Sequence, residues 1–132
     1  MSYSNYARAV NTYRERDVFT ASPARLVVMV YDHVVANLQR ARVARDAKRP
    51  DVQLEAIGKA RDGITELLVT LDLEKGGQIA ADLQQLYTYM LTQLVDGPRL
   101  DARVFDRILA MVGDLRESFA TIAGEPAKAP AA

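Results

Sequence analysis

Three short breaks in the helical pattern constrain what this chain can fold into. They lie at Pro50, at Gly76-Gly77 and at Gly97-Pro98, where proline or adjacent glycines end a helix. On either side of each break, apolar residues recur at intervals of three and four, and no alternating strand pattern competes. Four helices joined by short connections favour antiparallel neighbours. The sequence therefore predicts an all-α fold, an antiparallel up-down-up-down four-helix bundle.

Capping residues suggest where these helices begin. We expect the first helix to have Ser22 as its N-cap and Pro23 at its first position, and to end near Lys48. Asp51 is the candidate N-cap of the second helix, and Asp101 is that of the fourth.

The two ends of the chain differ from the bundle. Residues 124–132 are small and proline-containing, so we expect a disordered tail. Residues 1–21 are polar but have apolar side chains at helical spacing, which predicts a short N-terminal helical segment docked on the bundle. These side chains are Tyr3, Tyr6, Val10 and Tyr13. The expected domain organisation is a docking segment (1–21), a bundle (22–123) and a tail (124–132).

Composition excludes several classes of function. A chain of 132 residues is long enough for one domain with a real core. Lys and Arg together number 17, as do Asp and Glu, so the chain has no net positive charge that would attract a nucleic acid. The absence of cysteine removes disulfides, thiolate nucleophiles and the usual zinc sites. With no signal peptide and no apolar run of about 20 residues, we expect a cytoplasmic protein without membrane insertion.

The stretch LVVMVY, residues 26–31, is too apolar for a helix that buries only one face. Most apolar residues from 27 to 41 fall on one helical stripe that would face the core, and Val28 flanks this stripe. Met29, Ala36 and Val43 follow one another at intervals of seven on roughly the opposite side, and we call these three residues the outer seam. Scattered exposed apolar residues need no explanation. Alternatively, the outer seam receives an amphipathic segment from the chain's own N-terminus or from a partner.

The sequence offers little support for catalysis. His33 is the single histidine, and the adjacent Asp32 points in a different direction on a helix, so the two form no dyad. A bundle with one exposed histidine is similar to histidine phosphotransfer modules, which typically follow the histidine with Lys at the third and Gly at the fourth position. Here these positions are Ala36 and Asn37. A di-iron site needs Glu-x-x-His on two helices, which a chain with a single histidine cannot supply. We expect no enzyme, no cofactor and no metal.

Several strings together resemble the flagellin-specific export chaperone family, the FliS family, of bacterial flagellar systems. They are TASP (20–23), LVVMVYD (26–32) and LDLEKGGQIAADLQQLYTYM (71–90), with Tyr13 placed seven residues before Thr20. The resemblance covers about residues 10 to 122. It departs from the family pattern at His33, where the family usually has glycine, and near Gly97-Pro98.

The resemblance implies a helical bundle that acts without catalysis. Such proteins bind the disordered C-terminal region of flagellin in the cytoplasm, prevent its premature polymerisation and help deliver it to the flagellar type III export apparatus. The implied partners are therefore flagellin and a component of the export gate. A single chain that is self-complementary when the groove is empty could also form a homodimer, and the sequence does not decide between monomer and dimer. A histidine phosphotransfer bundle using His33 and a generic helical adaptor are the alternatives.

The residues expected to contact flagellin combine the resemblance with the outer seam. In the LYTYM string, Leu86, Tyr87 and Met90 lie on the core stripe, whereas Tyr89 lies off it and is the better contact candidate. The expected flagellin-binding residues are Tyr6, Val10, Tyr13, Val28, Met29, Ala36 and Tyr89.

Overall fold

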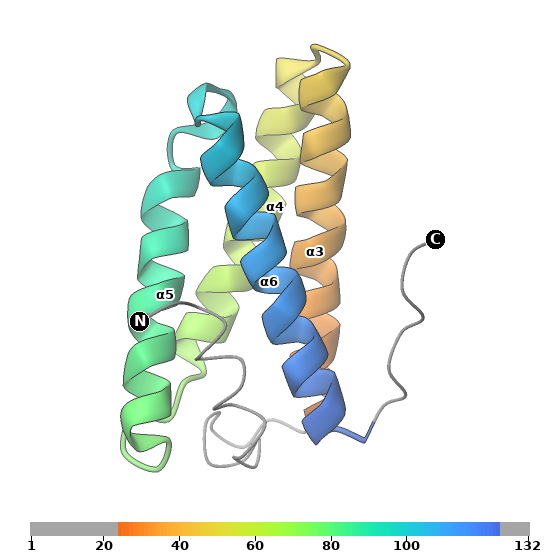
Figure 1. Ribbon diagram of the computed structural model, residues 1–132. Coiled ribbons are helices and arrows are strands. Elements are labelled where there is room, and N and C mark those ends of the chain that lie inside the picture. Colours follow the sequence, from red (N-terminus) through yellow and green to blue (C-terminus); the bar gives the residue numbers. More distant parts are fainter. Residues whose placement is uncertain (1–23, 125–132) are drawn as a thin grey trace.

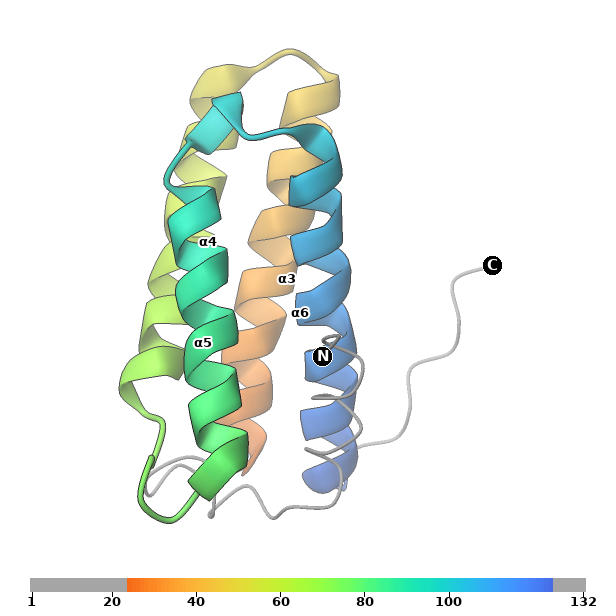
Figure 2. The same cartoon turned by 60° about the vertical axis from the view of Figure 1, so that its left-hand side comes forward.

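The four helices form the up-down-up-down bundle that the sequence predicts (Figures 1 and 2). The computed structural model describes residues 24–124. In this range α3 spans Ala24–Asp46, α4 Pro50–Val69, α5 Gly77–Leu94 and α6 Ala102–Ile122, and a 3-10 turn, η1, spans Gly97–Arg99. The predicted N-terminal segment and tail lie outside the described residues. None of the described helices is long and apolar enough to cross a bilayer.

The helices pack in a ring in which α3 and α5 lie diagonally. α3 contacts α4 on one side and α6 on the other, and α5 closes the ring mainly against α4. The contact between α5 and α6 is the slightest of these neighbour contacts. The two flanks of α3 are therefore both covered, and its remaining surface faces outward (Figure 1).

Two of the predicted caps have different outcomes. Asp101 caps α6, because its Oδ1 accepts a hydrogen bond of 2.8 Å from the backbone N–H of Arg103. The prediction that Asp51 caps α4 is wrong. Arg49 is the N-cap, Pro50 is the first helical residue, and Asp51 lies inside the first turn. Proline fits there because the first backbone N–H of a helix has no partner within the helix.

α3 ends at Asp46, slightly before the expected end near Lys48. Lys48 has a φ of 57°, in the left-handed region that usually belongs to glycine. The backbone N–H of Arg49 donates to the carbonyl of Ala44 at 2.8 Å, and that of Lys48 donates to Arg45 at 3.0 Å. These two bonds form a Schellman motif, which reverses the chain toward α4.

The core is centred on two tyrosines that connect the diagonal helices. The hydroxyl of Tyr31 in α3 hydrogen-bonds the hydroxyl of Tyr87 in α5, and both side chains are fully buried. The ring of Tyr31 also stacks on Phe119 of α6, with centroids 5.3 Å apart. Burial raises the pKa of both hydroxyls well above the usual value, so both stay protonated at neutral pH. One hydroxyl thus donates to the other, which gives each buried oxygen a hydrogen-bonding partner.

A glycine allows α3 and α4 to pack closely. A Cβ atom on Gly63 would lie 2.5 Å from Cγ2 of Val34 and 3.3 Å from Cδ2 of His33. Gly63 is buried in the middle of α4. Because no side chain separates the two backbones, the side chains of α3 pack directly onto the α4 backbone here.

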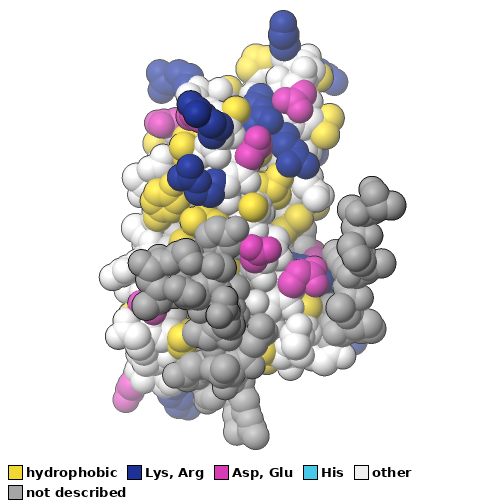
Figure 3. Space-filling view, in the orientation of Figure 1, with side chains coloured by type: hydrophobic (Ala, Val, Ile, Leu, Met, Phe, Trp, Pro, Cys, Tyr) yellow, Lys and Arg dark blue, Asp and Glu magenta, His cyan; other side chains and the backbone are white. Residues whose placement is uncertain are grey.

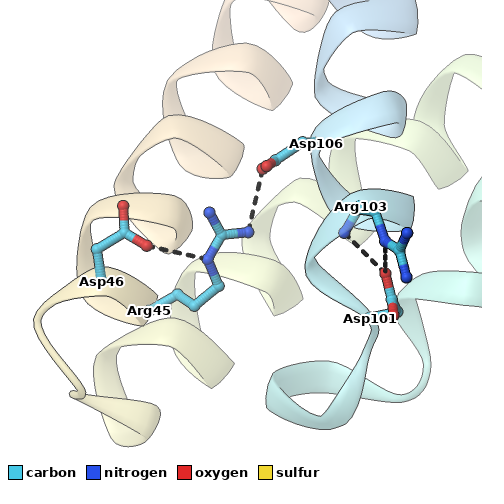
Figure 4. Close-up of polar contacts among 5 residues, drawn as sticks. All are labelled: Arg45, Asp46, Asp101, Arg103 and Asp106. Atoms are coloured by element: carbon cyan, nitrogen blue, oxygen red, sulfur yellow. Dashed lines mark hydrogen bonds and ion pairs between the residues drawn. The ribbon is translucent and has the colours of Figure 1, made fainter.

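Two arginines connect α3 and α6 near opposite ends. Arg116 is nearly buried, and its Nε donates to Oδ1 of Asp32 at 2.7 Å, which raises the pKa of the guanidinium. Arg45 donates to Asp106 at 3.0 Å and to Asp46 at 3.1 Å (Figure 4). The relative orientation of the two helices is therefore held at both ends.

We expect the tyrosine pair to show strong coupling in stability. Replacing either Tyr31 or Tyr87 alone by Phe leaves the other hydroxyl buried without a partner, which should lower the free energy of unfolding by about 1–3 kcal/mol. The double variant leaves no orphaned hydroxyl, so its loss should be clearly smaller than the sum of the single losses. Urea unfolding of the four proteins measures this difference. Additive losses would contradict the coupling.

We expect Gly63→Ala to destabilise the bundle by about 1–3 kcal/mol, because the new methyl group collides with Val34. Gly58→Ala is the matched control in the same helix, where a Cβ atom would meet nothing within 4 Å. The control should leave the free energy of unfolding unchanged or raise it by up to about 1 kcal/mol, since alanine is the better helix former. Thermal or urea unfolding compares the two variants. Equal effects would show that the close approach is unimportant.

Candidate partner-binding surface

The outward surface of α3 exposes large apolar side chains in a row. Met29 is 57% exposed and Val43 is 68% exposed, and the smaller Ala36 lies exposed between them. Leu26, at the edge of the same surface, is 51% exposed. The outer seam is therefore a real feature of the folded chain, and apolar surface of this kind favours contact with another apolar segment.

Two hollows border the outer seam where α3 meets α4. The Met29 hollow, of about 270 Å³, lies near the start of α3. It is lined by Leu26, Met29, Val30, His33 and Glu66. The Val43 hollow, also of about 270 Å³, lies near the end of α3. It is lined by Arg40, Val43, Ala44, Ala47, Arg49 and Val52. Each hollow is large enough for one or two apolar side chains of a partner.

The two hollows carry charges of opposite sign. Glu66 is the charged residue of the Met29 hollow, whereas Arg40 and Arg49 border the Val43 hollow. Arg40 pairs with Glu55 at 3.1 Å, and its hydrogen bond lowers the pKa of that carboxyl. Neither Glu66 nor Arg49 has an ion pair with any other residue of 24–124. Within the described part of the chain, these two charges therefore lie beside the hollows without a paired opposite charge.

The same separation of positive and negative charge extends over the whole bundle. Residues 40–59 and 96–107, at the end with the α3–α4 turn and η1, include nine Lys or Arg and six Asp or Glu. The rest of the described chain has four Lys or Arg and eight Asp or Glu. Figure 3 shows the basic side chains gathered over the end where α3 ends and α6 begins. One end of the bundle is thus basic and the other acidic.

His33 lies against α4 beside the Met29 hollow. Its Nε2 is 3.3 Å from the carbonyl oxygen of Lys59, and its Nδ1 is 3.4 Å from the amide nitrogen of Asn37. Both ring nitrogens therefore have a hydrogen-bonding neighbour. Among residues 24–124, no group of three or more His, Cys, Asp or Glu could hold a metal ion.

The structure brings together only part of the predicted binding set. Met29 and Ala36 both lie on the outer seam, two helical turns apart, whereas Tyr6, Val10 and Tyr13 lie outside the described residues.

Val28 belongs to the core rather than to the surface, with 1% of its side chain exposed. It lies one helical turn before Asp32, which pairs with Arg116 of α6, so it is on the flank that α6 covers. Tyr89 is half-buried on α5, diagonally across the bundle from α3. The sequence reasoning missed the α4 residues of the hollows, because a pattern on one helix does not identify its neighbour.

We expect neighbouring residues Val28 and Met29 to respond differently to the same charge. Val28→Asp puts an unpaired carboxylate in the core and should lower the free energy of unfolding by more than about 3 kcal/mol. Met29→Asp leaves the carboxylate in water and should change it by less than about 0.5 kcal/mol. Circular dichroism during urea unfolding measures both. A bundle that unfolds with Met29→Asp would show that Met29 belongs to the core.

Comparison with known proteins places the chain in a family. The model of the family described as flagellar protein FliS matches residues 6–126. The flagellar secretion chaperone FliS of Salmonella typhimurium is 34% identical over 110 residues, 82% of each chain. The flagellar secretion chaperone FliSB of Pseudomonas aeruginosa is 30% identical over 106 residues, 80% of this chain and 84% of its own. By the length of the family match and these identities, this chain belongs to the FliS family of flagellar secretion chaperones.

Proposed function

We propose that this protein is a cytoplasmic export chaperone for flagellin. In this proposal it binds the disordered C-terminal region of flagellin, prevents its premature polymerisation and helps deliver it to the flagellar type III export apparatus, where a gate component is its second partner. Family membership supports the secretion role. The observation that carries the binding role is the outer seam, a row of exposed apolar residues along α3 with a hollow at each end.

The geometry of the outer seam suits an amphipathic helix. Met29 and Val43 are fourteen residues apart, which corresponds to about 21 Å along α3 at 1.5 Å per residue. A flagellin helix lying along α3 would place two apolar side chains, about four turns apart, in the Met29 and Val43 hollows. Ala36, between them, permits close approach of the two backbones. Binding would fold a disordered flagellin segment and cover the apolar positions through which flagellins associate.

Other residues of the predicted set enter the proposal in different roles. Tyr6, Val10 and Tyr13 would cover the outer seam when flagellin is absent and move when it binds. Tyr89 would contact a part of flagellin that continues around the bundle to α5. No catalytic step is part of this function. The contacts of both His33 ring nitrogens with Lys59 and Asn37 do not favour the phosphotransfer alternative.

The test is calorimetric titration of the full chain with a synthetic peptide of the C-terminal region of flagellin from the same organism. We expect binding, and we expect Met29→Asp to weaken it at least tenfold, about 1.4 kcal/mol, because a carboxylate would enter an apolar contact. Val95→Asp is the matched control, since Val95 is 62% exposed but lies beyond α5, away from α3. Absence of any binding by the unaltered protein at about 50 µM would exclude the proposed function.

A further inference from the structure

The basic end of the bundle, formed by residues 40–59 and 96–107, carries cations that no carboxylate of the described chain neutralises. Four of its cations have ion pairs, namely Arg40, Arg45, Lys59 and Arg103. The other five are exposed and have no ion pair among residues 24–124. They are Arg42 of α3, Lys48 and Arg49 of the α3–α4 turn, Arg99 of η1 and Arg107 of α6. Within the same range, Asp51 and Asp96 are the carboxylates of this end without an ion pair, so cations are in excess.

Packing joins the segments that supply these cations. The start of α4 contacts η1, where a Cβ atom on Gly97 would lie 3.3 Å from Cδ1 of Leu54. Arg45 at the end of α3 donates to Asp106 of α6 at 3.0 Å (Figure 4), and its guanidinium lies 5.6 Å from the centre of the Phe105 ring. The cations therefore belong to one packed surface rather than to separate loops.

Large apolar side chains are exposed at the same end. They are Val43 of α3, Leu54 of α4 and Val95 at the end of α5, and more than half of each is exposed. Val43 is next in sequence to Arg42, and Val95 precedes Arg99 by four residues. Figure 3 shows basic and apolar side chains interspersed over this end. The surface thus combines positive charge with apolar groups.

This combination suits the surface of an anionic bilayer better than other polyanions. Lipid headgroups attract cations, and apolar side chains next to them enter the boundary between headgroups and acyl chains. A strongly acidic polypeptide offers mainly charge. Single-stranded nucleic acid is usually bound by stacking its bases on exposed rings. Phe105 is the one aromatic residue of the basic end, and it is buried.

The acidic end determines how the bundle approaches an anionic surface. An anionic surface repels the excess of carboxylates there. α3 has 23 residues, which corresponds to about 34 Å at 1.5 Å per residue. This length is about four times the Debye length of roughly 8 Å at physiological ionic strength. A bundle that stands on its basic end therefore keeps its acidic end out of reach of the repulsion, whereas a bundle lying flat does not.

We propose that the basic end is a docking surface for the anionic phospholipid headgroups of a bilayer, with the bundle standing end-on and no helix inserted. The unpaired cations supply most of the attraction, and Leu54 and Val95 enter the headgroup boundary. The proposal does not depend on flagellin binding. Because the Met29 hollow lies near the opposite end of α3, it faces the solution while the protein is docked. Membrane contact and cargo binding are therefore compatible.

Co-sedimentation of the full chain with vesicles tests the role of the cations. Vesicles of phosphatidylglycerol and phosphatidylcholine in equal parts should bind the protein at low salt, and vesicles of phosphatidylcholine alone should not. The double variant Arg99→Gln/Arg107→Gln should lower the partition coefficient by about tenfold or more. Arg25→Gln/Lys75→Gln is the matched control, because it removes two exposed cations from outside the basic end. Equal losses in both double variants, or no binding to the anionic vesicles, would overturn the proposal.

Val95→Asp distinguishes a bilayer from an acidic polypeptide. It places a carboxylate in the headgroup boundary, so vesicle binding should fall by about fivefold or more, while flagellin peptide binding in calorimetry stays unchanged. Met29→Asp should have the opposite pair of effects. Vesicle binding that is unaffected by Val95→Asp and is displaced by soluble polyglutamate would overturn the proposal in favour of an acidic polypeptide. Calorimetry with the flagellin peptide tests the proposed function separately, so the two failures are distinguishable.

Discussion

The hydrogen bond between Tyr31 and Tyr87 is the contact on which the arrangement of this bundle depends most. Packing between neighbouring helices would still leave the rotation of α3 about its own axis adjustable by small steps. The tyrosine pair joins α3 to the helix diagonally opposite, and Phe119 stacks on the same ring from α6. With Tyr31 fixed toward the centre, the residue two positions earlier must point away from it, because two residues are separated by about 200° on a helix. The exposure of Met29 is thus a direct consequence of the burial of Tyr31.

The neighbours of α3 then determine how wide the exposed strip is. α4 comes in closely because Gly63 has no side chain, and α6 is held by Arg116 and Arg45. Both flanks are covered by these contacts, so the apolar surface that remains is a row one residue wide with a hollow at each end on the α4 side. A face this narrow accommodates one helix or extended segment, and it does not suit a broad, flat partner surface.

Much of the fold could be read from the sequence because the signals are local. Pro50, Gly76-Gly77 and Gly97-Pro98 divide the chain, and the apolar spacing within each segment identifies core residues such as Tyr31 and Tyr87. The candidate site was harder to predict from the sequence. Position on a helix shows that Met29 points away from Tyr31, but whether the flank at Val28 is covered depends on α6, which is far away in sequence. The hollows could not be predicted for the same reason, since residues of α4 form part of each wall.

The turn between α3 and α4 shows that this chain has not been optimised for stability alone. Lys48 occupies a left-handed backbone conformation that glycine adopts freely and that costs another residue about 1 kcal/mol. Glycine there would make the turn easier to form, but it would remove a cation from the basic end of the bundle, next in sequence to Arg49 at the Val43 hollow. A protein that keeps lysine at such a position gives up folding free energy and retains local charge. Lys48 therefore combines a left-handed backbone with a cation at this turn, and glycine in its place would change the backbone preference and the local charge together.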